Sequence, residues 1–126
     1  MAALAADLGV GQTSEGRAVR RELLVLHSAS VLKTIDAPRV PLGPAEDVRA
    51  ALDAVFGEGT WQDPSEGLFD GPGFSLLAKM SIFPLVETMT LEVWGERDPF
   101  RHINALCAAR GWQAFDLGSG EQVAPR

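Results

Sequence analysis

The side chains able to act as nucleophile or general base are few: His27 and His102 are the only histidines, Cys107 is the only cysteine, and tyrosine is absent. His102 and Cys107 are separated by five positions in a segment with helical spacing. That separation places them about 140° apart around a helix, so they cannot form a local nucleophile–base pair. Cys107 falls on the apolar side of the segment, where a free cysteine is usually buried and inert. We expect His102 to face solvent, and we assign no catalytic residue.

A carboxylate cluster is the second candidate group, with Asp63, Glu66 and Asp70 in a glycine-rich stretch. Carboxylates in a loop can bind a hard cation such as Ca²⁺, but their spacing departs from the EF-hand pattern. A structural zinc site would need a CxxC or HxxxH pair, and the sequence has neither. We therefore expect no metal. We retain His27, Asp63, Glu66 and Asp70 as a possible ligand pocket, on the condition that the fold brings His27 beside a carboxylate.

Signatures for phosphate and nucleic-acid binding are also weak. The sequence Gly71-Pro72-Gly73 lacks the Lys and the Ser or Thr of a phosphate loop, and it precedes an alternating run instead of a helix. The chain has 11 Lys and Arg against 17 Asp and Glu, a net charge of −6. This charge repels phosphate backbones, and it would suit docking onto a basic partner. We expect no cofactor and no nucleic-acid partner.

The length of 126 residues is that of one domain, and the hydrophobic fraction of 46% can supply a core without disulfides. We interpret residues 1–17 as a flexible leader and residues 18–126 as a single domain. The lone cysteine and the absence of a basic signal region favour the reducing cytoplasm. No apolar run approaches the roughly 18 residues of a spanning helix, so we expect no membrane association.

Two segments have the spacing of amphipathic helices. Residues 44–56 begin with Pro44, which is tolerated in a first helical turn, and Gly57 follows as a stop signal. Their apolar stripe consists of Val48, Ala51, Leu52, Val55 and Phe56. The second helix is expected to begin at Asp98-Pro99, with Asp98 as the N-cap, and to end at Gly111. Its buried stripe is expected to contain Phe100, Ile103, Leu106 and Cys107.

Alternating runs indicate strands. The strongest are 74–83, which Pro84 ends, and 88–94, and their short connection predicts an antiparallel pair. Residues 18–35 fit a helix or a doubly buried strand, and we favour a strand over 22–28. Weaker strand signals lie at 112–117 and 121–123, with short pieces near Trp61 and Phe69.

The order of these elements is βαββαβ, the ferredoxin-like order, with a possible last hairpin strand. We therefore expect an α+β two-layer sandwich. It would have an antiparallel sheet of four or five strands and both helices on one face.

This architecture would leave Leu77, Phe83 and Trp94 together on the open face of the sheet. Three large apolar groups there are explained equally well by a covering segment of the chain and by a partner surface. Our first hypothesis is a non-enzymatic protein-binding module that self-associates through this face, most simply as a homodimer. In size and charge the chain is similar to small acidic bacterial immunity proteins, which neutralise partner toxins, although no motif is specific to them.

Two further hypotheses follow from the same elements. One is a small-molecule site or small enzyme, with its pocket between sheet and helices or inside a dimeric barrel. The other is a structural subunit of a larger assembly.

Overall fold

The computed structural model describes residues 21–29, 35–36 and 38–125. The predicted leader, residues 1–17, lies outside the described residues, as do 18–20 and 30–34 of the ambiguous segment. The elements, in chain order, are β1 (Arg21–Ser28), β2 (Arg39–Val40), α1 (Ala45–Phe56), β3 (Thr60–Asp63), β4 (Glu66–Gly71), β5 (Phe74–Met80), β6 (Met89–Gly95), α2 (Phe100–Arg110), β7 (Gln113–Asp116) and β8 (Gln122–Ala124). The strand expected over 22–28 is confirmed as β1.

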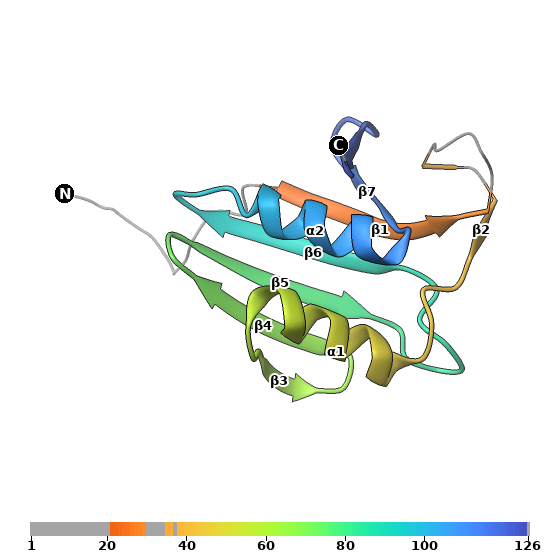
Figure 1. Ribbon diagram of the computed structural model, residues 1–126, viewed down its shortest axis with the longest axis horizontal. Coiled ribbons are helices and arrows are strands. Elements are labelled where there is room, and N and C mark those ends of the chain that lie inside the picture. The colour runs from red at the N-terminus through yellow and green to blue at the C-terminus, as the bar shows by residue number, and fades with distance from the viewer. Residues whose placement is uncertain (1–20, 30–34, 37, 126) are drawn as a thin grey trace.

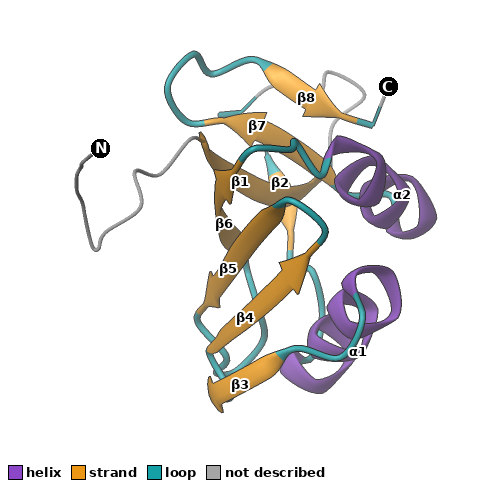
Figure 2. Ribbon diagram, turned by 90° about the vertical axis from the view of Figure 1, so that its left-hand side faces the viewer, coloured by secondary structure: helices purple, strands orange, loops and turns teal. Residues whose placement is uncertain are grey.

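The fold is α+β, with one antiparallel sheet and two helices, but the ferredoxin-like prediction is wrong. The sheet has eight strands in the order β3-β4-β5-β6-β1-β7-β8, and β2 pairs with β1 outside this path. Figure 1 shows the long central strands of this sheet, and Figure 2 shows both helices on one of its faces. The two-layer arrangement is therefore as expected, while the strand number and strand order are not.

The glycine-rich stretch 58–73 is the main source of the error, because the short pieces expected near Trp61 and Phe69 are two full members of the sheet, β3 and β4. Gly67 lies in β4 directly opposite Trp61, and a Cβ atom on Gly67 would lie 2.7 Å from the Trp61 ring. Glycine inside a strand often marks a close approach of this kind. Directly before β3, a Cβ on Gly59 would similarly lie 2.5 Å from the Phe69 ring. These glycines make room for aromatic rings and do not end the sheet.

The core lies between the sheet and the helices. Alternate residues of the central strands are buried against the helical layer, as the pleat requires. The strand residues that are buried on this side of the sheet include Leu23, Val25, Phe69, Leu76, Ala78, Met89, Leu91 and Val93. The helices contribute Val48, Ala51 and Leu52 from α1, and Ile103, Leu106 and Cys107 from α2.

The helix ends differ from expectation in one detail. Asp98 does not cap α2, since Pro99 occupies the N-cap position and no side chain caps the helix. The Asp98 carboxylate instead accepts a hydrogen bond from Arg21 in β1 at 2.8 Å. The end of α2 is as expected, with Gly111 in the left-handed conformation at φ 73°.

Among the helices in the described part of the chain, none has the length and apolar character needed to cross a bilayer.

Candidate functional site

The predicted ligand pocket is not assembled in this fold. Asp63 and Glu66 face each other across the β3–β4 hairpin, but Asp70 lies at the other end of β4, roughly 14 Å along the strand. His27 is on β1, three strand spacings or roughly 14 Å away from β4 across the sheet. Nε2 of His27 approaches Gly111 at the end of α2 instead. Because His27 lies beside none of these three carboxylates, the geometric condition set for this pocket is not met.

Two of these carboxylates have local hydrogen-bond partners. The Asp63 carboxylate accepts hydrogen bonds from the Ser65 hydroxyl and backbone N–H, and these bonds lower the pKa of Asp63. The Asp70 carboxylate accepts one from the Ser75 hydroxyl. Within the described residues, no three His, Cys, Asp or Glu side chains are arranged to hold a metal ion.

Cys107 is buried in the core, and burial raises the pKa of its thiol to about 12. A thiol with such a pKa is almost entirely protonated near neutral pH and is a poor nucleophile. His102 is exposed, as expected, although its ring stacks on Phe56 at a centroid distance of 5.7 Å. Neither side chain is placed for nucleophilic catalysis.

The predicted partner set of Leu77, Phe83 and Trp94 is divided by the structure. Leu77 and Trp94 are partly exposed on the sheet face away from the helices, where Leu77 pairs with Leu68 of β4. Phe83 is not part of that face, because β5 ends at Met80 and Phe83 lies in the following loop. The alternation of 74–83 continues beyond the last residue that pairs with β6, so periodicity alone assigned Phe83 to the wrong surface.

The open sheet face also carries charge. Lys79 and Glu92 form an ion pair at 2.6 Å, and Glu22 lies directly opposite Glu92 on the neighbouring strand. The Glu92 carboxylate raises the pKa of Lys79, with smaller contributions from Glu66 and Glu22. Further along this face, between β1 and β7, Leu26 and Phe115 are buried. The open face is thus a mixture of acidic and apolar groups.

Exposed apolar side chains gather at one end of the molecule instead. Among the described residues, four large hydrophobic side chains are exposed: Phe83 at 88%, Leu117 at 42%, Val40 at 39% and Leu85 at 37%. Three of them, Val40, Phe83 and Leu85, come from two segments that are joined by backbone hydrogen bonds. We call these three residues the Phe83 end.

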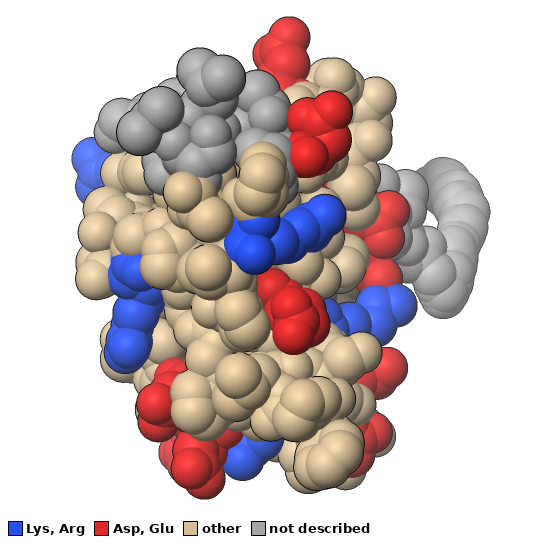
Figure 3. Space-filling model, turned by 90° about the vertical axis from the view of Figure 1, so that its right-hand side faces the viewer, with Lys and Arg blue, Asp and Glu red and all other residues tan. Residues whose placement is uncertain are grey.

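The hydrogen bonds that join the two segments run in both directions. The N–H of Leu42 donates to the carbonyl of Val86 at 2.7 Å, and the N–H of Val86 donates to the carbonyl of Gly43 at 2.8 Å. Figure 3, which faces this side, shows uncharged surface with acidic and basic side chains interspersed. The sequence signal that could have located this end is the Phe83-Pro84-Leu85 triplet between two strands, since Pro84 marks a loop and loops run over the protein surface.

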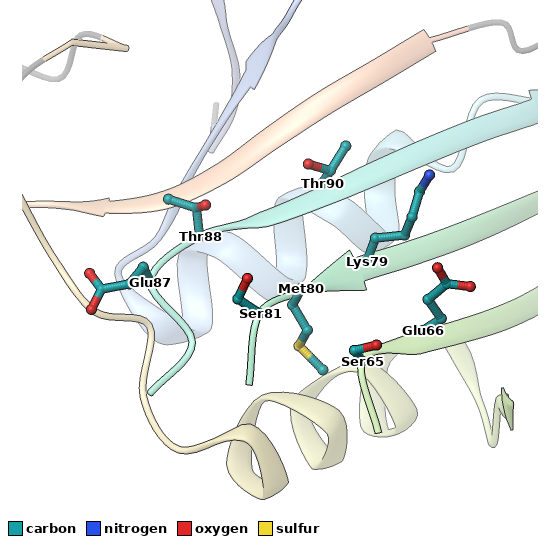
Figure 4. A pocket seen from close by; sticks show the side chains of 8 residues that line it. All are labelled: Ser65, Glu66, Lys79, Met80, Ser81, Glu87, Thr88 and Thr90. Atoms are coloured by element: carbon teal, nitrogen blue, oxygen red, sulfur yellow. The ribbon is translucent and has the colours of Figure 1, made fainter. Parts of the chain in front are cut away.

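A groove lies beside the Phe83 end, where β4 begins and where β5 and β6 meet the loop that joins them (Figure 4). Its volume is about 400 Å³, and it is open to solvent. Its charged lining residues are Glu66, Lys79 and Glu87. Hydroxyl groups supply most of the remaining lining, from Ser65, Ser81, Thr88 and Thr90. Ligand pockets of this volume are usually apolar and enclosed, so this groove is better suited to a polar group that reaches in from outside.

Comparison of the chain with protein-family models, with curated proteins and with solved structures finds no match.

Proposed function

We propose that this protein is a non-enzymatic protein-binding domain that docks onto a basic protein surface through its Phe83 end. The observation that carries the proposal is the 88% exposure of Phe83 in a loop that is fixed by backbone hydrogen bonds. Burial of one such aromatic side chain contributes about 1.5–3 kcal/mol. Aromatic groups that insert into a partner's pocket are frequent hot spots of protein interfaces.

Charge supports a basic partner. The chain carries a net charge of −6. Near the Phe83 end, Glu46 and Asp47 are exposed in the first turn of α1, and Glu87 is exposed in the loop. Arg39 is the exposed cation of β2 next to them. Complementary charge accelerates association and selects among partners. An inhibitory role, like that of the small acidic immunity proteins, would follow from such docking.

Self-association through the sheet face stays a prediction. Two copies that paired through this face would each bring Glu22, Glu66 and Glu92 into the interface, with Lys79 as the compensating cation. Like charges across an interface are destabilising. This repulsion is our reason for placing the main interface at the Phe83 end.

The single buried cysteine is compatible with a reducing compartment such as the cytoplasm.

The experiment compares three forms of the full chain: wild type, Phe83→Ser and Leu117→Ser. Leu117 is the matched control, because it is also an exposed apolar residue but follows β7, away from the loop after β5. Proteins captured from the native host by each form are identified, and a captured partner is purified. Its affinity for the three forms is then measured by calorimetry at several salt concentrations.

We expect Phe83→Ser to weaken binding of the purified partner at least tenfold, and Leu117→Ser to leave it within twofold of wild type. Binding should also weaken as salt rises, because complementary charges are screened. Equal affinity of wild type and Phe83→Ser, or tightening with salt, would contradict the proposal. So would a chain that binds only itself in light scattering and captures nothing.

A further inference from the structure

We propose that the groove beside the Phe83 end receives a cationic side chain, an arginine or a lysine, of the protein partner. This inference rests on the proposed function, and it specifies how a basic surface would be recognised. It depends on the charge of the groove, on its connection to the Phe83 end, and on its shape.

The charge of the groove is negative even though a lysine lines it. Glu66 and Glu87 line the groove, and Lys79 is held by Glu92 at 2.6 Å. Counting Glu92 with the lining, the groove has three carboxylates and one ammonium group, which leaves a charge of −2. Glu92 and, to a smaller extent, Glu66 raise the pKa of Lys79. The negative charge of these carboxylates therefore acts on this side chain. An added cation would therefore be attracted to the groove.

The groove and the Phe83 end share one loop of the chain. Ser81, Glu87 and Thr88 line the groove and belong to the same loop as Phe83 and Leu85. In Figure 4, Glu87 and Glu66 lie on opposite sides of the groove, with Ser81 and Met80 between them. A partner docked on Phe83 would therefore present its neighbouring side chains to this groove.

The shape favours a side chain over a free metabolite. The groove is open to solvent, and apart from Lys79 and Met80 it is lined by hydroxyl and carboxylate groups, so most of its lining can form hydrogen bonds. A guanidinium group has five N–H donors and no acceptor, and it binds carboxylates with directed hydrogen bonds. Glu66, Glu87 and the hydroxyl of Thr88 are acceptors of the required kind.

The test uses two peptides as probes against the full-length, isotope-labelled protein. The first is acetyl-Gly-Arg-Gly-amide. The second is the same peptide with citrulline in place of arginine, which is almost identical in shape but uncharged. We expect the arginine peptide to shift the backbone amide resonances of Ser81, Glu87 and Thr88 in a saturable manner. The citrulline peptide should leave them unchanged at the same concentrations.

Variants locate the site. Glu87→Gln and Glu66→Gln should each weaken binding of the arginine peptide at least threefold. Glu96→Gln, an exposed carboxylate after the far end of β6, should leave it unchanged. The same spectra report whether each variant is folded. Equal shifts with both peptides, an equal loss with Glu96→Gln, or shifts spread over all acidic surfaces would overturn the inference.

Failure of this inference can be separated from failure of the proposed function. Phe83→Ser should reduce partner binding but leave the arginine peptide's affinity unchanged, because Phe83 does not line the groove. If Phe83→Ser leaves partner binding intact, the proposed interface is wrong whatever the peptide shows. If the arginine peptide does not bind but Phe83→Ser abolishes partner binding, only the role of the groove is wrong.

Discussion

At the scale of single residues, the most informative feature is the pairing of glycines in and next to strands with aromatic rings. Gly59, Gly67 and Gly71 each lie so close to a ring that a Cβ atom there would come within 2.7 Å of it. The rings belong to Phe69, Trp61 and Phe74, respectively. An aromatic ring that covers a glycine compensates for the missing side chain in a sheet. Gly67 and Gly71 are therefore structural parts of β4 and not turn residues, and Gly59 lies directly before β3.

This pairing predicts a specific coupling between Gly67 and Trp61. Gly67→Ala should lower the free energy of unfolding by about 1–3 kcal/mol, because the new methyl group overlaps the Trp61 ring. In a Trp61→Val background the same substitution should cost clearly less, because the obstructing ring is gone. Urea unfolding of the four proteins of this double-mutant cycle measures both costs. An equal cost in both backgrounds would mean that the ring is not what excludes the methyl group.

A second prediction at this scale concerns Cys107. Burial raises the pKa of its thiol to about 12, so the thiolate is scarce at pH 8. Iodoacetamide should therefore label the native protein at least a hundredfold more slowly than the urea-unfolded chain, in which the thiol is exposed. Mass spectrometry of samples taken over time gives both rates. Rapid labelling of the native protein would show that Cys107 is accessible, contrary to its position on the buried side of α2.

At the scale of elements, the contact between α1 and the β3–β4 hairpin explains how the sheet reaches eight strands. One carboxylate oxygen of Asp53 in α1 accepts a hydrogen bond from the N–H of Gly59 at 3.1 Å and another from Nε1 of Trp61 at 3.2 Å. The Phe56 ring, at the end of α1, packs against Phe69 at 5.7 Å. The helix thus holds the hairpin against the sheet edge.

Asp53→Ala should destabilise the fold by about 1–2 kcal/mol in chemical unfolding, whereas Ala54→Ser, on the exposed side of α1, should not.

The sequence predicts helices and long strands in this chain because their signals are local. The stripe from Val48 to Leu52 and the alternation from Phe74 to Met80 are set by side chains a few positions apart, and both elements are confirmed. Strand order depends on which distant segments pair, and no local pattern contains that information. The hairpin near Trp61 was underestimated because its glycines resemble a loop unless the opposing rings are known.

The candidate site was predicted less well than the fold, for a related reason. Leu77 and Trp94 were assigned to the open face correctly, because they lie inside paired strands. Phe83 was misassigned, because alternation does not reveal where pairing stops. Val40 carries no sequence signal of its own, because its segment is joined to the Phe83 loop only through the backbone hydrogen bonds that Val86 makes with Leu42 and Gly43.

The turn between β7 and β8 gives a pH-dependent prediction. Backbone N–H groups of Ser119 and Gly118 donate to the Asp116 carboxylate, and together with Arg21 they lower its pKa below 3.8. A lowered folded-state pKa contributes stability that is present above the unfolded-state pKa and is lost as pH falls through the folded-state pKa. Asp116→Asn should therefore be less stable than wild type near pH 7, and the difference should shrink below pH 3.8. A difference that stays constant from pH 7 to pH 2 would contradict this role of the charge.

At the scale of the whole molecule, two surfaces combine charged with exposed apolar side chains. The open sheet face combines the Lys79–Glu92 pair with Leu77 and Trp94, whereas the most exposed aromatic group is at the Phe83 end. The edges of the sheet are poor docking sites, because β3 is short and irregular and β8 has three residues. Short, irregular edge strands resist pairing with other chains. Contacts between molecules should therefore form through the Phe83 end or the open face, and substitutions can separate the two.

Net charge provides the means to compare these surfaces in the absence of a partner. The isoelectric point is about 4.8, so repulsion between copies is strong at pH 7 and weak near pH 4.8. We expect light scattering to show a monomer at pH 7 and association near pH 4.8, driven by exposed apolar groups. Phe83→Ser should reduce this association while changing the free energy of unfolding by less than about 0.5 kcal/mol, because the side chain is 88% exposed. Leu77→Ser should have little effect on it. If Leu77→Ser suppresses association and Phe83→Ser does not, copies of this chain meet through the open sheet face and the Phe83 end is not the main contact surface.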